Sequence, residues 1–66
     1  MDIFVNGEKK GIEKNMSLAV LLAKLGLETQ PVAVELNGQV IKKQNHAITP
    51  LHEGDRLEIV TFVGGG

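Results

Sequence analysis

The sequence predicts an α+β fold, in which a mixed sheet of four or five strands carries one helix packed across one face. Three observations support this prediction. Two segments that alternate between apolar and polar residues each lead into an Asn-Gly pair, a leucine-rich segment with helical spacing lies between them, and a third alternating segment comes last. Strands have a side-chain period of two and helices a period of 3.6, so these patterns distinguish the elements.

Size and composition indicate one small domain without disulfide bonds. The chain has 66 residues, no cysteine and 42% hydrophobic residues, so its apolar core must supply the stability. The formal net charge of −1 gives no electrostatic reason to expect a nucleic acid or a membrane as partner. The sequence has neither a secretion signal nor the roughly 18 consecutive apolar residues of a membrane span. We therefore expect a cytoplasmic protein.

The first two strands are predicted to form a hairpin. Residues 1–6 alternate, and Asn6-Gly7 follows as a strong hairpin signal, because a type I′ turn needs positive φ at both central residues. The return segment, residues 8–14, is charged and has little to bury. Lysine discourages pairing between sheets, so we place this segment at an edge.

A single short helix is predicted next. Ser17 offers an N-cap oxygen, and Gly26 stands where a residue with left-handed backbone would end the helix. The leucines between these two residues recur at helical spacing and would form the face that packs on the sheet: Leu18, Leu21, Leu22 and Leu25.

The second hairpin and a last strand complete the predicted sheet. Residues 32–41 alternate around the second Asn-Gly pair, the stretch Gln44–Asp55 is expected to be irregular, and the strand Arg56–Val63 comes last. The first and last strands can lie side by side in parallel, because a connection that contains the helix separates them. This is the β-grasp arrangement, which we assign to residues 1–63.

Three glycines, Gly64, Gly65 and Gly66, follow the last strand directly. Glycine has no Cβ, so another backbone or a ligand can approach it closely. An extended chain reaches about 13 Å from Val63 to Gly66, which is enough to enter a narrow pocket of another protein. We predict that residues 64–66 are a flexible tail that presents the carboxylate of Gly66. A frayed chain end is the alternative that the glycines alone leave open.

The other polar residues show no catalytic or metal-binding pattern. His46 and His52 have no cysteine partners, whereas a zinc site needs three or four ligands, so we predict no metal site. We interpret both histidines as solvent-exposed or turn-bonding. Glu53 and Asp55 are expected to serve the turn before the last strand. The lysines lack interleaved aromatic residues, which indicates solvated edge strands rather than an RNA-binding surface.

Several segments resemble the ThiS family, the ubiquitin-like sulfur carriers of thiamine biosynthesis. The segments that carry the resemblance are Met1–Val5, Ser17–Leu27, Val32–Gly38 and Glu53–Gly66. The last segment is the most specific, since an acidic-Gly-Asp turn, an apolar strand and terminal glycines follow in that order. Lys42-Lys43 departs from the Pro-Arg pair of many relatives. The loop Gln44–Ile48 matches poorly, so no function is transferred to it.

The resemblance implies that the tail carries sulfur. An adenylating enzyme of the ThiF type would use ATP to activate Gly66, which would then become a thiocarboxylate. The sulfur donor would be a cysteine desulfurase or a persulfide carrier, and the acceptor a thiazole synthase of the ThiG type. Gly64 and Gly65 would pass through the partner's channel. The protein would be a co-substrate and not an enzyme, would bind no cofactor of its own, and would be a monomer.

A tail in a channel is a small contact, so we expect the partner to dock on the domain as well. The alternation places Phe4, Val60 and Phe62 on the sheet face opposite the helix, with the small Ala33 nearby. We predict that these residues form a docking patch. Ordinary surface hydrophobic residues are the alternative.

The sequence leaves four other functions open. The same sulfur chemistry would suit the small subunit of molybdopterin synthase or a carrier for tRNA thiolation, although those relatives tend to be longer. A protein modifier would join Gly66 to lysines, as ubiquitin does. A β-grasp interaction module would have an inert tail.

Overall fold

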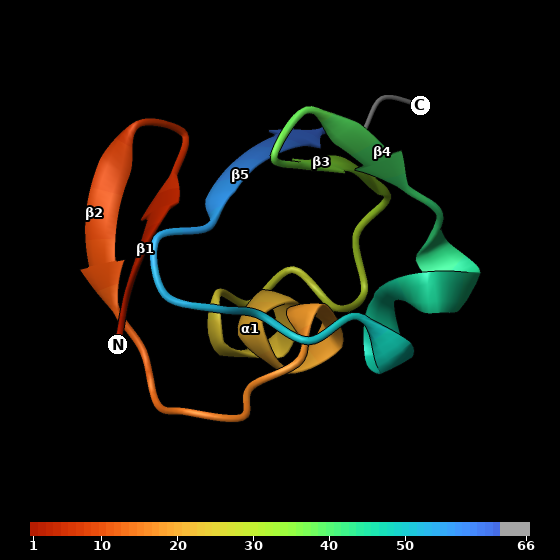
Figure 1. The fold of residues 1–66 in the computed structure, drawn as a ribbon. Helices are drawn as coiled ribbons and strands as arrows, with labels where there is room; N and C mark the ends of the chain where they lie inside the picture. Colours follow the sequence, from red (N-terminus) through yellow and green to blue (C-terminus); the bar gives the residue numbers. More distant parts are fainter. Residues whose placement is uncertain (63–66) are drawn as a thin grey trace.

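The structure, a computed structural model, describes residues 1–62. Its elements in chain order (Figure 1) are β1 (Asp2–Val5), β2 (Glu8–Gly11), α1 (Leu18–Lys24), β3 (Val32–Leu36), β4 (Gln39–Ile41), the 3₁₀-helix η1 (Lys43–Ile48) and β5 (Arg56–Thr61). Val63 and the three terminal glycines lie outside the described residues. The predicted boundary after residue 63 and the flexible tail therefore stay predictions.

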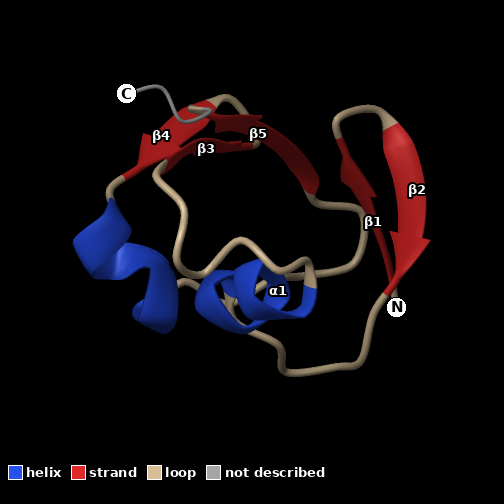
Figure 2. Cartoon of the chain, turned by 180° about the vertical axis from the view of Figure 1, so that it is seen from behind, coloured by secondary structure: helices blue, strands red, loops and turns tan. Residues whose placement is uncertain are grey.

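The strands form one mixed sheet of five, in the order β2-β1-β5-β3-β4. The neighbours β1 and β5 are parallel, with Val5 opposite Leu57, and the other neighbouring pairs are antiparallel. The sheet arches over α1, which lies on its concave side in both views (Figures 1 and 2). This arrangement confirms the predicted β-grasp fold and the edge position of β2.

Both Asn-Gly pairs form the turns that the sequence predicts. The φ angles are 50° and 84° at Asn6 and Gly7, and 51° and 87° at Asn37 and Gly38. Positive φ at both central residues is what a two-residue hairpin turn requires, and it fixes the register of the strands that follow.

The helix α1 begins and ends where its capping residues predict. The backbone N–H of Val20 donates to Oγ of Ser17 over 3.2 Å, and Gly26 has φ 76° just beyond the last turn. Leu27 then folds back, because its N–H donates to the carbonyl oxygen of Leu22 over 2.8 Å. No helix in residues 1–62 has both the length and the apolar character needed to cross a membrane.

The core lies between α1 and the concave face of the sheet. It joins side chains from the sheet, from the helix and from the connecting segments: Ile3, Val5, Val34, Leu57 and Ile59; Leu18, Leu21 and Leu22; Met16 and Leu51. The predicted leucine stripe is therefore the core-facing side of the helix, with Leu25 partly buried beside it.

The stretch predicted to be irregular contains η1, so the prediction was wrong for residues 44–48. Within η1, His46 is buried and its Nε2 lies 3.1 Å from the carbonyl oxygen of Ile41. The solvent-exposed interpretation of His46 is thus wrong, and its side chain bonds to the backbone at the end of β4. A short 3₁₀-helix has no apolar period long enough to recognise in a sequence.

Candidate functional site

The strand β5 leads toward the predicted tail, and its neighbours hold it along its length. Five residues of β3 pair with Leu57–Thr61 of β5, and β1 pairs with its beginning. Beyond the end of the strand, the N–H of Phe62 still donates to the carbonyl oxygen of Pro31 over 3.2 Å. The predicted tail therefore follows a backbone that is anchored up to the last described residue.

Asn6 continues the pairing of β1 with β5 after β1 itself has ended. Its side-chain Nδ2 donates to the carbonyl oxygen of Ile59 over 3.1 Å, and its Oδ1 accepts from the N–H of Ile59 over 2.7 Å. The side-chain amide thus takes the place of a peptide group in the ladder. Ile59 would otherwise have no strand partner on this side, since the chain turns away at Gly7.

Asn37 and Asp55 fix the other end of β5. Asn37 accepts from the N–H of Arg56 through Oδ1 over 2.9 Å and donates through Nδ2 to Oδ1 of Asp55 over 3.0 Å. The second carboxylate oxygen of Asp55 accepts from the N–H of His52 over 2.7 Å. Asp55 is buried, and these bonds confirm that it serves the turn before β5. The carboxylate of Glu53 accepts from the N–H of Asp2 over 3.1 Å and so joins the turn to β1.

The anchoring roles of Asn6 and Asn37 were missed in the sequence. Each Asn-Gly pair predicts a hairpin turn without any further role for the asparagine side chain. What the side chain reaches depends on which strand lies beside the turn, and that follows only from the strand order of the whole sheet.

Val60 and Phe62 lie on the outer face of the sheet, opposite the face that packs on α1. Val60 is opposite Ala33 on β3, and the exposed fractions of Val60 and Phe62 are 55% and 57%. These placements agree with the predicted arrangement of the docking patch. The docking role itself stays a prediction, as do the roles of Gly64, Gly65 and Gly66, which lie outside the described residues.

Phe4 also points to the outer face but lies apart from Val60 and Phe62. It is opposite Arg56, whose guanidinium carbon is 4.8 Å from the centre of the Phe4 ring. Val60 is four residues further along β5, which corresponds to about 13 Å. The arginine partly covers the ring by a cation–π contact, so Phe4 is half-buried.

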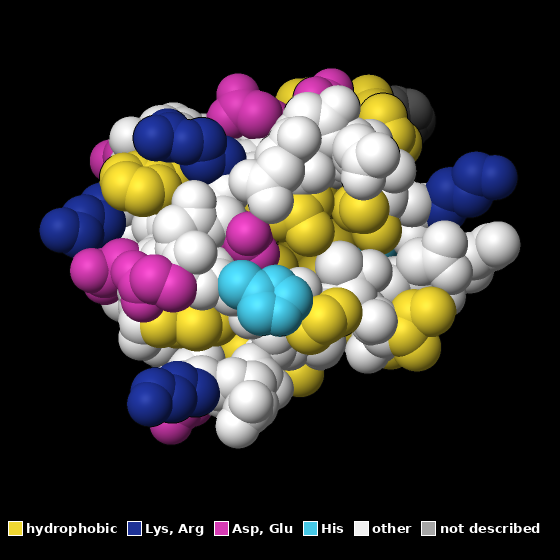
Figure 3. Space-filling model, viewed as in Figure 1, with side chains coloured by type: hydrophobic (Ala, Val, Ile, Leu, Met, Phe, Trp, Pro, Cys, Tyr) yellow, Lys and Arg dark blue, Asp and Glu magenta, His cyan; other side chains and the backbone are white. Residues whose placement is uncertain are grey.

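Two glutamates stand directly opposite each other in the middle of the outer face. Glu35 of β3 is the cross-strand partner of Glu58 of β5, and on its other side Glu35 pairs with Val40 of β4. Both carboxylates and Val40 are exposed. Acidic groups stand among hydrophobic side chains along the upper rim of the molecule, above β5, β3 and β4 (Figure 3). The sequence places Glu58 outward, but only the register shows that it faces Glu35.

The two histidines have separate structural partners. His46 bonds to Ile41, and the exposed His52 has its Nδ1 3.9 Å from Oδ2 of Asp55. Among residues 1–62 there is no group of three or more His, Cys, Asp or Glu side chains placed to hold a metal ion.

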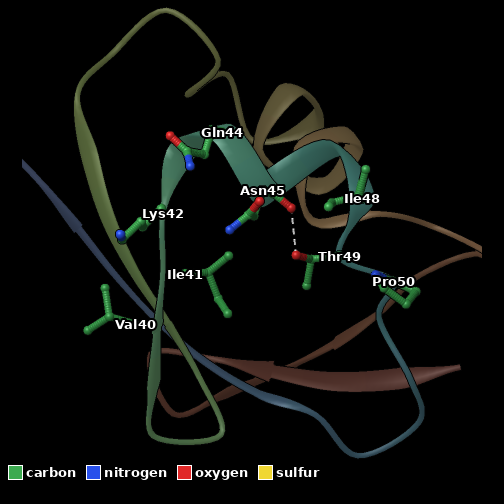
Figure 4. Close-up of a pocket in the computed structure, with 8 residues that line it drawn as sticks. All are labelled: Val40, Ile41, Lys42, Gln44, Asn45, Ile48, Thr49 and Pro50. Carbon is green, nitrogen blue, oxygen red and sulfur yellow. Dashed lines mark hydrogen bonds between the residues drawn. The ribbon is translucent and has the colours of Figure 1, made fainter.

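A shallow groove of about 520 Å³ runs between β4 and η1 (Figure 4). Ile41 points into it and Val40 points to the other side of the strand, while Thr49 Oγ1 donates to the carbonyl oxygen of Asn45 over 2.6 Å. Among the described residues that line the groove, only Lys42 is charged. The described lining of the groove thus contains no pair of an acidic and a basic side chain. The hydroxyl group of Thr49 already forms a hydrogen bond within the fold.

Comparison with known proteins gives a consistent result over the whole chain. The model of the ThiS family matches residues 3–66, which include the three terminal glycines. The sulfur carrier protein ThiS of Thermus thermophilus is 33% identical over 64 residues, which cover 97% of this chain and 98% of that protein. The crystal structure of the thiamine biosynthesis protein ThiS from Geobacter metallireducens is similar, with a TM-score of 0.84 and 32% identity over 100% of both chains.

Longer proteins also contain a segment similar to this chain. The thiazole synthase of Paramagnetospirillum magneticum is 39% identical over 66 residues, and the match covers all of this chain. The chain spans 20% of the length of that protein, and the same share of a thiazole synthase from Magnetococcus marinus.

Proposed function

The chain belongs to the ThiS family, and on this premise we propose that it is a sulfur carrier of thiamine biosynthesis whose reacting group is the carboxylate of Gly66. The observation that carries the proposal is the family match, which continues through β5 to residue 66. In this proposal Gly64 and Gly65 are the part of the chain that passes through the narrow site of a partner enzyme.

The proposed chemistry follows from the poor reactivity of a carboxylate. Its negative charge repels nucleophiles, and oxide is a poor leaving group. Transfer of AMP from ATP to the Gly66 carboxylate releases pyrophosphate and gives an acyl-adenylate, in which AMP is a good leaving group. Hydrosulfide then attacks the acyl carbon and AMP departs, which leaves a thiocarboxylate and a proton. Glycine suits this step, because the acyl carbon must enter a confined site from which water is excluded.

The proposal needs three kinds of partner. An adenylating enzyme of the ThiF type supplies the ATP chemistry. A cysteine desulfurase or persulfide carrier supplies the sulfur as a persulfide, from which a second thiol releases hydrosulfide and forms a disulfide. A thiazole synthase of the ThiG type accepts the sulfur. The last partnership has support from the two proteins named thiazole synthase that contain a segment similar to this chain. The carrier itself is a protein substrate and supplies neither an acid nor a base.

The structure is consistent with separate roles for the domain, which would dock on the partner, and the tail, which would react. The strand β5 is anchored by Asn6 on one side and by β3 on the other. Val60 and Phe62 are exposed on the outer face close to the point where the tail begins. A partner that binds the tail can therefore also contact this face.

Intact mass spectrometry tests the proposed reaction. The chain is incubated with ATP, sulfide and the adenylating enzyme of the same source, and a sample without ATP is the control. We expect the mass change of replacing one oxygen by sulfur, located at Gly66 by fragmentation. An unchanged mass, with an enzyme that is active on a known carrier, would contradict the proposal.

A growth experiment separates the thiazole pathway from molybdopterin synthesis and tRNA thiolation. The family match and the thiazole synthase relatives favour the thiazole pathway. We expect a strain that lacks this gene to require thiamine and to recover when it is supplied. A growth defect that thiamine does not relieve would favour one of the other acceptors.

A further inference from the structure

We propose that the outer face of β3, β4 and β5 is a docking surface for a partner protein that places one cationic side chain between Glu35 and Glu58 and surrounds it with apolar side chains. The inference rests on the proposed function, and the occupant to which it commits is the adenylating enzyme that binds the tail. The surface, here called the acidic–apolar face, consists of Ala33, Glu35, Val40, Glu58, Val60 and Phe62.

The apolar side chains of this face are more exposed, and lie closer together, than scattered surface hydrophobic residues. Val40 has an exposed fraction of 71%, and Val60 and Phe62 are both more than half exposed. The strand register places Val60 beside Ala33 and Val40 beside Glu35, so these residues form one continuous surface over three neighbouring strands. An apolar surface of this kind, rimmed by polar groups, is typical of a protein interaction site.

The acidic part lies within that apolar surface. Glu35 and Glu58 are direct cross-strand partners, so their Cβ atoms are about 4.5–5.5 Å apart. Like charges in this position destabilise a sheet. Among residues 1–62 the close contacts between basic and acidic side chains are Lys9 with Asp2 and His52 with Asp55, and neither involves these two glutamates.

Arg56, the basic residue closest in sequence to Glu58, contacts another residue. Arg56 precedes Glu58 by two residues on β5, and its guanidinium group lies over the ring of Phe4. Lys42 follows Val40 by two residues and lies on the same side of the chain (Figure 4), but among the described residues it forms no ion pair with Glu35 or Glu58. The described part of the fold therefore holds two adjacent carboxylates that have no ion-pair partner.

These observations specify the chemistry of the partner. An apolar partner without a cation would remove two carboxylates from water and leave them unpaired, which is costly. A partner with an acidic group here would be repelled. A guanidinium group has five N–H donors and can bond both carboxylates at once, and arginine is common in the centre of interfaces. The face thus selects a cation set among apolar side chains.

The position of the face fits the adenylating enzyme as occupant. Val60 and Phe62 lie at the end of β5 from which the predicted tail continues. Any partner that holds the tail must lie next to this end of the strand, and in the proposed reaction the adenylating enzyme is the first to do so. Docking on the acidic–apolar face and insertion of the tail can therefore occur in one complex.

The test compares the affinity of the adenylating enzyme for three forms of the complete chain. These are the unmodified chain, the double variant Glu35→Gln with Glu58→Gln, and the control variant Glu28→Gln. Glutamine keeps the size of the side chain and removes its charge. Glu28 is exposed near α1, on the opposite side of the sheet. Titration calorimetry gives Kd at low and at high salt, and mass spectrometry follows thiocarboxylate formation.

We expect the double variant to raise Kd by about tenfold or more and to show a weaker dependence of Kd on salt. Its thermal midpoint should be equal to or above that of the unmodified chain, because the repulsion between the carboxylates is removed. The Glu28→Gln control should leave Kd unchanged. A loss of affinity with retained stability would then place the interaction at the acidic–apolar face.

The remaining outcomes overturn the inference in distinguishable ways. If the unmodified chain is thiocarboxylated while the double variant binds as tightly, or the control weakens binding equally, the inference fails and the proposed function stands. If the unmodified chain is neither bound nor thiocarboxylated, both fail. If the double variant forms dimers more readily in sedimentation experiments and binds the enzyme normally, the face belongs to a second copy of the chain.

Discussion

Asn6 combines two requirements that few other residues satisfy at one position. Its backbone has φ 50°, in the left-handed region that asparagine tolerates better than most residues. Its side-chain amide donates to and accepts from the backbone of Ile59. A glycine would fit the turn without making these bonds, and a β-branched residue would do neither. The turn and the contact of Ile59 on the β1 side of the strand therefore both depend on Asn6.

We expect Asn6→Ala to lower the free energy of unfolding by about 2–4 kcal/mol. Two net hydrogen bonds account for roughly 1–3 kcal/mol, and the strain of a positive φ adds about 1 kcal/mol. Chemical denaturation measures the total. Hydrogen exchange should also show faster exchange of the Ile59 amide, because its acceptor is removed.

Asn15 is the matched control for this prediction. It too has a positive φ, 62°, and within residues 1–62 its side chain makes no hydrogen bond to another residue. Asn15→Ala should therefore report the strain alone and cost about 1 kcal/mol. Equal losses at the two positions would show that the bonds of Asn6 to Ile59 contribute nothing.

The helix α1 is the element on which the core depends most. It has seven residues, and an isolated helix of this length is not stable in water, so its packing on the sheet must maintain it. Leu18, Leu21 and Leu22 are its buried residues. The chain has no disulfide bond to compensate for a loss here.

We expect Leu21→Ala to lower the free energy of unfolding by about 2–5 kcal/mol, since Leu21 is 2% exposed and the change leaves a cavity. A domain of this size has a total stability of about 3–10 kcal/mol, so a large part of it would be lost. Urea titration followed by circular dichroism measures the change. Val20→Ala on the same helix is the control, because Val20 is 46% exposed and the change should alter stability by less than about 0.5 kcal/mol. A similar loss in both variants would argue against the packing shown here.

The elements that the sequence predicts correctly are those with a local cause. Ser17 and Gly26 delimit α1 because their effect is on the backbone nearest to them, and the Asn-Gly pairs determine their own turns. The helix η1 was missed because its residues lack a recognisable period. The burial of His46 was missed for the same reason, since a histidine in a polar segment gives no sign of the carbonyl group that it will meet.

The candidate site was predicted in part, and the missing part depends on register. Alternation alone places Phe4, Val60 and Phe62 on one face of the sheet. It does not say that β1 is opposite the beginning of β5, which separates Phe4 from the other two. Likewise Glu35 and Glu58 are 23 positions apart in the sequence, and only the pairing of β3 with β5 makes them neighbours.

At the scale of the whole molecule, the residues that stabilise the fold are separate from the residue that we propose reacts. The core, the capping residues and the asparagine contacts all lie within residues 1–62. The residue proposed to react, Gly66, lies outside this part of the chain. In the proposed function, the fold holds β5 and presents the acidic–apolar face, while a partner enzyme carries out the chemistry. This separation makes the contribution of the last two glycines measurable without disturbing the domain.

Removal of Gly65 and Gly66 should therefore abolish thiocarboxylate formation and leave the thermal midpoint unchanged. The new terminal carboxylate, on Gly64, would end about 7 Å short of the position that the Gly66 carboxylate reaches. Activation depends on placing the acyl carbon beside ATP within a fraction of this distance. Affinity for the adenylating enzyme should fall only moderately, because the acidic–apolar face is intact. Mass spectrometry, thermal unfolding and titration calorimetry measure the three quantities, and adding two glycines back should restore the reaction. A shortened chain that still acquires sulfur would show that the reacting group is not the carboxylate of Gly66.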